Sequence, residues 1–126
     1  MADGLATATA NSFLSVLRNT AYSAIATVFV QLHVGAPGAA GTSNISALTT
    51  RNAITWNAAS AGSMTLATLS NFTMTTSETI TDVSLWTASS AGTFLWSATL
   101  SASVPVINGS VLSFSSFTLG FTPIAA

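Results

Sequence analysis

The scarcity of charge is the feature that most constrains this chain. Its 126 residues include only two basic and three acidic side chains, and lysine is absent. Soluble domains are ordinarily about a quarter charged, so serine and threonine hydroxyls must supply much of the polar surface here. Because so few charges give little electrostatic repulsion between copies, we expect neighbours to cover the chain and a homo-oligomer to form.

Composition also limits the partners and the chemistry of the chain. It has no cysteine and a single histidine, His33, which excludes disulfides and a metal cluster built on cysteine or histidine. No basic patch is available for a phosphate backbone, and no apolar stretch is long enough to span a bilayer. We therefore expect no cofactor, no metal, no nucleic-acid partner and no membrane partner.

The N-terminal region has the one helical pattern in the chain. Its apolar residues lie near a single stripe, at spacings of three and four residues. The stripe includes Phe13, Leu14, Leu17 and Tyr22. This pattern predicts a helix within residues 5–22, firmest over residues 11–20. We expect residues 1–27 to form an arm and helix whose stripe is either a docking or oligomer interface or a cover for the β domain.

Alternating apolar residues predict short strands from residue 28 onward. The alternation is clearest over residues 28–34, 51–56 and 93–100, and glycine-rich turns separate these segments. We expect residues 28–126 to form an antiparallel β-sandwich or jelly-roll-like domain. The chain as a whole is then a single, mainly β domain with one N-terminal α-helix.

Several local signals refine this expectation. Pro105 cannot donate a backbone hydrogen bond, which favours an edge strand. Asn108-Gly109 is typical of a two-residue hairpin turn. The apolar alternation changes phase near Asp82 and again at Ser115-Ser116, which predicts two β-bulges.

One segment of the chain occurs twice. Residues 56–63 and 86–93 each begin with tryptophan, continue through small residues and reach Ala-Gly. This pattern predicts two equivalent hairpin loops. Trp56 and Trp86 end their strands, so we expect both to be partly exposed and available for aromatic contacts, such as stacking on a sugar.

No group of side chains predicts catalysis. His33 is expected on the less buried face of its strand, without a partner that would make it a general base. Glu78 and Asp82 would stand more than ~12 Å apart along a strand, which is too far for a glycosidase pair. Their expected role is an ion pair with Arg51 or Arg18, or a turn cap at Asp82. The chain is therefore predicted not to be an enzyme.

Several motifs follow one another in a recognisable order over residues 12–122. They are Phe13-Leu-Ser-Val-Leu17, Asn19-Thr-Ala-Tyr22, Ala26 to His33, Pro37-Gly-Ala-Ala-Gly41-Thr, Arg51 to Gly62, Ile80 to Leu95 and Asn108-Gly109. This order resembles that in short β-rich virion proteins of actinobacterial, mycobacteriophage-like tailed phages. An acidic residue usually precedes the first-loop proline in that family, and Ala36 stands there in this chain.

The resemblance implies a virion structural component. Proteins of that kind are labelled head decoration, minor capsid, minor tail or tail fibre proteins. Because one compact domain does not bridge the length of a fibre, we favour a decoration protein on the outer surface of the head. It would bind the major capsid protein and stabilise the assembled shell. The alternative is a minor tail or tail-fibre-tip protein that contacts the host surface or a carbohydrate.

Overall fold

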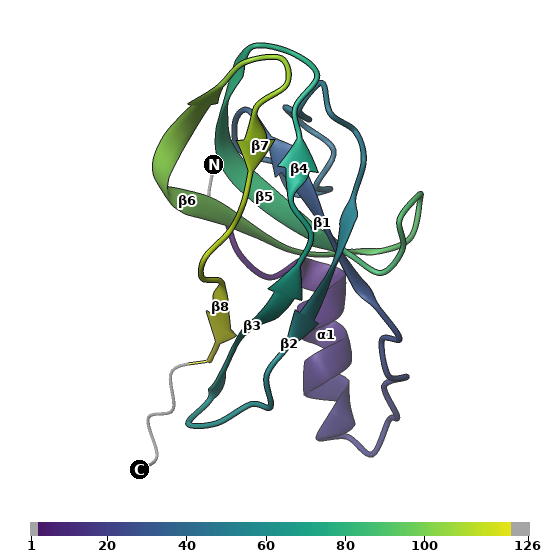
Figure 1. Ribbon diagram of the computed structural model, residues 1–126. Coiled ribbons are helices and arrows are strands. Elements are labelled where there is room, and N and C mark those ends of the chain that lie inside the picture. The colour runs from purple at the N-terminus through teal and green to yellow at the C-terminus, as the bar shows by residue number, and fades with distance from the viewer. Residues whose placement is uncertain (1–2, 122–126) are drawn as a thin grey trace.

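A curled antiparallel sheet dominates the computed structural model, which describes residues 3–121 (Figure 1). The elements in chain order are α1 (Thr7–Val16), β1 (Val28–His33), β2 (Asn52–Trp56), β3 (Ser63–Leu69), β4 (Phe72–Thr73), β5 (Glu78–Trp86), β6 (Phe94–Val106), β7 (Val111–Leu112) and β8 (Thr118–Gly120). The prediction of a mainly β fold with one N-terminal helix is confirmed.

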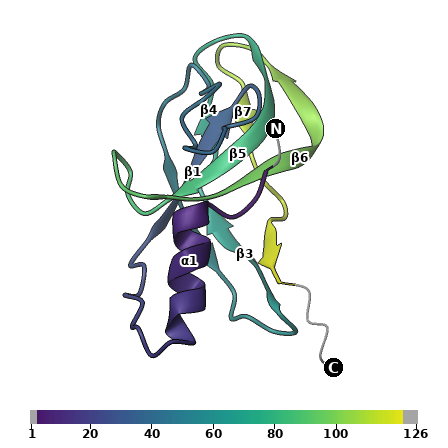
Figure 2. The ribbon, with the colours of Figure 1, turned by 180° about the vertical axis from the view of Figure 1, so that it is seen from behind.

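Two sheets enclose one core. The larger sheet has the strand order β6-β5-β1-β2-β3-β8, and β4 and β7 form a small second sheet. Phe72 of β4 and Leu112 of β7 enter the same apolar cluster as Val30 and Leu32 of β1. This arrangement is consistent with the predicted β-sandwich. The helix α1 packs against β6, and Figure 2 shows it from behind.

The central strand β1 is buried on both faces at its C-terminal end. Val30 and Leu32 are fully buried, as the alternation predicts, but Gln31 and His33 on the other face are buried too. The loop after β1 folds back over that face, since Val34 N–H donates to Asn44 O at 2.8 Å. The prediction that His33 lies on a less buried face is therefore wrong, because a loop covers it.

Two of the local signals in the second half of the chain are confirmed. β6 is an edge strand, and Pro105 lies in it opposite Thr79 of β5. The register between β5 and β6 shifts between Ile80 and Asp82, where the first bulge is predicted.

Two other predictions fail because strands change sheets. A turn does form at Asn108-Gly109, and Ser110 N–H donates to Ile107 O at 3.0 Å. The strands that it joins do not pair with each other, since β6 pairs with β5 and β7 pairs with β4. The second expected bulge is likewise absent. Residues 113–117 instead carry the chain from the small sheet to β8 in the large one.

The repeated segment forms two equivalent hairpin loops, as predicted. One joins β2 to β3 and the other joins β5 to β6, and both strand pairs are antiparallel. Each loop ends on the same pair of left-handed residues. The φ angles are 51° and 78° at Ala61 and Gly62, and 53° and 76° at Ala91 and Gly92.

Candidate functional site

The helix divides the predicted apolar stripe between two environments. Phe13 is partly buried on the side that faces the sheet, and Thr9 on the same side donates from Oγ1 to Phe94 O at 3.4 Å. Leu14 and Leu17 point outward and are 64 % and 85 % exposed. The stripe therefore covers the β domain through Phe13 and leaves two leucines in solvent.

The helix also ends sooner than predicted. It ends at Val16, and Asn19 adopts a left-handed conformation with φ of 61°. A residue of that conformation commonly terminates a helix, and asparagine tolerates it better than most residues. Tyr22 therefore lies beyond the helix, but its ring still packs edge-on against Phe13, with centroids 5.3 Å apart.

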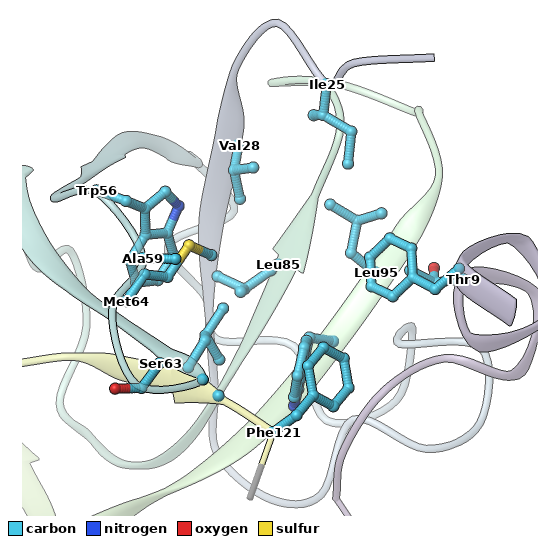
Figure 3. A pocket seen from close by; sticks show the side chains of 15 residues that line it. Thr9, Ile25, Val28, Trp56, Ala59, Ser63, Met64, Leu85, Leu95 and Phe121 are labelled. Carbon is cyan, nitrogen blue, oxygen red and sulfur yellow. The ribbon is translucent and has the colours of Figure 1, made fainter. Parts of the chain in front are cut away.

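An apolar pocket of about 230 Å³ opens between α1, the β2–β3 hairpin and the segment after β8 (Figure 3). Val28, Leu85 and Leu95 come from three neighbouring strands, and Trp56 and Met64 face them from the β2–β3 hairpin. Among the residues that the structure describes, none that lines the pocket is charged. It can therefore accept an apolar group, and it offers no acid, base or anion to a reacting molecule.

Phe13 and Phe121 form one wall of this pocket. Their ring centroids are 6.3 Å apart, and Phe121 also lies 5.9 Å from Trp96. The backbone places Phe121 there because its N–H donates to Gly62 O at 2.8 Å. A Cβ on Gly120 would lie 2.8 Å from that same oxygen, so glycine is required for this approach.

Trp56 lies in the opposite wall and is half-buried. Its ring packs edge-on against Phe117 with centroids 5.5 Å apart. Its indole Nε1 is buried and has no hydrogen-bond partner among the residues that the structure describes. An unpaired buried donor costs about 1–3 kcal/mol, so the Trp56 position is not optimised for the stability of the isolated domain.

Trp86, the matching tryptophan of the second hairpin, is buried and lies outside the pocket. Its Nε1 donates to Ser84 Oγ at 2.7 Å. The Arg51 guanidinium lies 4.0 Å from the centre of its ring and also donates to Ala88 O and Ala91 O. The prediction that Trp86 is exposed is wrong, because Arg51 and the loop that it holds cover the indole.

The buried His33 shares a hydrogen-bond partner, Ser84, with Trp86. Its Nδ1 lies 2.8 Å from Ser43 O and its Nε2 lies 2.7 Å from Ser84 Oγ. A carbonyl only accepts, so Nδ1 carries the proton and Ser84 donates to Nε2. Burial lowers the pKa of His33, which favours the neutral imidazole. Both His33 and Ser84 are fully buried, so this pair is closed to a substrate.

The carboxylates interact with hydroxyl groups instead of forming the expected ion pair with Arg51. Glu78 accepts hydrogen bonds from Ser46 Oγ and from Ala47 N–H. Asp82 accepts one from Thr99 Oγ1 at 3.0 Å. Arg51 donates to amide carbonyls, so its predicted pairing with Glu78 or Asp82 is wrong. The alternative of a turn cap at Asp82 is wrong too, because Asp82 lies within β5.

Only some of the residues that the sequence predicts to contact a partner lie together in the structure. Phe13 and Trp56 line one pocket, Tyr22 packs behind Phe13, Leu14 and Leu17 face solvent, and Trp86 lies elsewhere. Sequence reasoning missed other lining residues. These are Met64, Leu95 and Phe121 among others. Each belongs to a different strand or segment, and no spacing along the chain predicts that they meet.

The described residues contain neither a candidate metal site nor a candidate membrane-spanning helix. Among residues 3–121, no three histidine, cysteine or acidic side chains lie close enough together to hold a metal ion. The same part of the chain has no helix with the length and apolar character needed to cross a bilayer.

Comparison with known proteins identifies the family. No curated protein matches this chain. The family described as "Podophage GP4 fiber I protein gp80" matches residues 4–122, which is nearly the whole sequence. The match supports the virion part of the resemblance and does not show an actinobacterial origin. This chain therefore belongs to the podophage fiber I protein family and is a phage structural protein.

Proposed function

We propose that this chain is a component of the phage tail fibre. The observation that carries this proposal is the family match over residues 4–122, whose description names a fibre protein. It favours the alternative of the sequence analysis over the head decoration protein that we first preferred. That preference assumed that a fibre protein must itself be long, but a compact domain can occupy one position within a longer assembly.

Within the fibre, we infer that the chain binds a neighbour through what we call the α1 end. This end comprises residues 7–18, which form α1 and the turn after it, the loop of residues 57–62 and Phe121. Figure 1 shows α1 and the β2–β3 loop at the same extremity of the molecule. Leu14, Leu17 and Phe121 are exposed there, and an apolar pocket opens beside them. Large apolar side chains grouped around a pocket are typical of a surface that another protein covers.

We expect the neighbour to be a second copy of this chain or another fibre protein. This proposal replaces the major capsid protein, which the sequence analysis expected as the partner. Arg18 is the one charged residue in the part of the α1 end that the structure describes. Selectivity there must come from shape and apolar contact, since charge pairs contribute little.

We also infer that the protein acts without catalysis. His33 is enclosed with Ser84, Glu78 binds hydroxyl and amide hydrogens, and the pocket contains no titratable group. These arrangements support binding and structure as the role of the chain.

Copy number per virion tests the proposal. Quantitative mass spectrometry of purified particles should give a small number of copies relative to the major capsid protein, and immunogold should label the tail. Hundreds of copies with label on the head would overturn the fibre assignment and restore the decoration protein bound to the capsid.

A further inference from the structure

A groove lies at the open seam of the curled sheet, away from the pocket described above. The strand order leaves β6 and β8 as the two edges of the six-stranded sheet. The edges come together near Trp96 and Phe121, then β6 separates from the segment between β7 and β8. A groove of about 350 Å³ opens there between residues 98–104 and residues 112–118, with the core residue Val83 also in its lining.

Part of this edge of β6 already binds an extended segment. Ala6 N–H donates to Leu95 O at 2.8 Å, and Ser97 N–H donates to Gly4 O at 2.8 Å. Leu5 lies opposite Trp96 in an antiparallel bridge. The described N-terminal residues 3–6 thus run along β6 as a very short strand, and Asp3 accepts a hydrogen bond from Thr99 Oγ1 at the margin of the groove. Beyond Ser97, no described strand pairs with this edge.

The opposite wall of the groove also has unpaired backbone. Phe117 C=O accepts from Leu66 N–H at 2.8 Å, but residues 114–116 form no backbone hydrogen bond with another described residue. Unpaired N–H and C=O groups on a strand edge are a template for another extended chain. Both walls of the groove therefore offer the hydrogen-bonding groups that a further strand requires.

The side chains indicate which kind of strand fits. Every described lining residue is apolar, serine or threonine, and none of them carries a charge. A charged side chain would lose hydration there without a partner. Successive side chains of a strand point to opposite faces. An apolar residue could thus face Val83 and Leu112 in the core, and the next residue would face solvent.

We propose that this groove receives an extended, uncharged segment of another virion polypeptide, which adds as a strand to β6 and closes the seam. The mode of binding is β-strand addition, in which main-chain hydrogen bonds supply affinity and alternate side chains supply specificity. The identity of the partner as a virion protein rests on the proposed function, but the groove's preference for an extended peptide does not.

A saccharide fits the groove less well than a peptide. Phe114 packs edge-on against Phe72, and Phe117 packs edge-on against Trp56, at 6.2 and 5.5 Å between centroids. Both rings are thus engaged in the core. Among the described lining residues, no side chain carries a carboxylate, amide or guanidinium group that could orient sugar hydroxyls.

Hydrogen exchange on the purified chain tests the proposal. The probes are three soluble hexapeptides that alternate threonine with valine, leucine or phenylalanine. We expect at least one to slow amide exchange at residues 100–103 and 114–116 by tenfold or more. The same peptide with alternate N-methyl groups keeps its side chains but loses main-chain donors, and it should give no protection. If no peptide protects these residues, or if N-methylation has no effect, the proposal is wrong.

A bulky substitution and a saccharide complete the test. Ala102→Tyr fills the groove from an exposed position, and Ser89→Tyr is a matched change in the exposed β5–β6 loop. Circular dichroism first establishes that both variants are folded. Only Ala102→Tyr should then weaken peptide binding tenfold or more, and equal binding by both would contradict the proposal.

Protection of these residues by maltohexaose but by no peptide would identify a saccharide site instead. A head location found by copy number would overturn the proposed function and leave these peptide results standing.

Discussion

The two hairpin loops have nearly the same sequence and the same backbone, yet their tryptophans lie in different surroundings. Trp86 is buried, its N–H is bonded to Ser84 and Arg51 lies over its ring. Trp56 is half-buried beside an apolar pocket, and its buried N–H has no partner among the described residues. Local sequence therefore determines the loop conformation, and the surrounding strands determine what the tryptophan does.

Under the proposed function, this difference separates a hairpin that stabilises the domain from one that binds a neighbour. Arg51 lies on the Trp86 side of the sheet and ties its loop down through two carbonyl oxygens. The β2–β3 loop has no such cation and instead borders the pocket with Ala59 and Gly62. We therefore expect stability to depend on the β5–β6 hairpin and association to depend on the β2–β3 hairpin.

Truncating the two tryptophans should give the largest contrast. Trp86→Ala should lower the free energy of unfolding by about 3–5 kcal/mol, since it empties a buried aromatic site. Trp56→Ala should cost roughly half as much, because the half-buried ring already borders an open pocket. Urea denaturation measures both values, and equal losses would contradict the contrast.

Removing the cation over Trp86 should have the next largest effect. Arg51→Met keeps much of the side-chain length and removes the cation–π contact and the loop hydrogen bonds. We expect a loss on the order of 2 kcal/mol and faster amide exchange at residues 87–93, with no change at residues 57–62. Arg51→Lys keeps the charge but not the planar fork, so it should recover only part of the loss. Equal loosening of both loops would show that Arg51 does not distinguish them.

The His33 cluster next to Trp86 should make stability depend on pH. Burial lowers the pKa of folded His33 below its ordinary value of 6.5, although nearby Asp82 opposes that shift and nearby Arg51 adds to it. The unfolded chain then binds a proton more readily than the folded one. The stabilisation is complete above about pH 6.5 and is lost as the pH falls toward the folded pKa, by at most about 1.4 kcal/mol per pH unit.

Urea denaturation between pH 7.5 and 5.5 measures this effect. The wild-type free energy of unfolding should fall with pH over this range, and a folded His33→Asn variant should show a flatter profile. A wild-type profile that is flat over the same range would contradict the role of burial.

The smallest effect is expected from Trp56→Phe. This change removes the unpaired indole N–H and keeps an aromatic ring in the pocket wall, so the free energy of unfolding should change by less than about 1 kcal/mol in either direction. Trp86→Phe removes a satisfied donor and should be clearly destabilising. A larger loss for Trp56→Phe than for Trp86→Phe would reverse the assignment of the two hairpins.

The sequence predicts local conformation here far better than it predicts which segments meet. The two Ala-Gly hairpins, the edge position of Pro105 and the bulge near Asp82 follow from residues close together in the chain, and all form. The Asn108-Gly109 turn forms too, but the strands beside it pair elsewhere. A turn motif fixes a change of direction and carries no information about which sheet the next strand joins.

The candidate site shows the same limit. Alternation and helical spacing place Phe13 and Trp56 on plausible faces, but the pocket also needs Leu95 from β6 and Phe121 after β8. Those residues meet only because the sheet curls. The exposure of Trp86 is mispredicted for a related reason, since the residue that covers its ring, Arg51, lies just before β2 and thirty-five positions earlier in the chain.

Solvent access in the assembled virion tests the central claim most directly. The chain lacks cysteine, so Ser60→Cys and Ser90→Cys place single thiols at matching exposed positions of the two hairpins. If the α1 end binds a neighbour, maleimide should label Ser60→Cys at least tenfold more slowly in virions than in the free chain, and Ser90→Cys should label equally fast in both. Protection of Ser90→Cys with free labelling of Ser60→Cys would contradict the account.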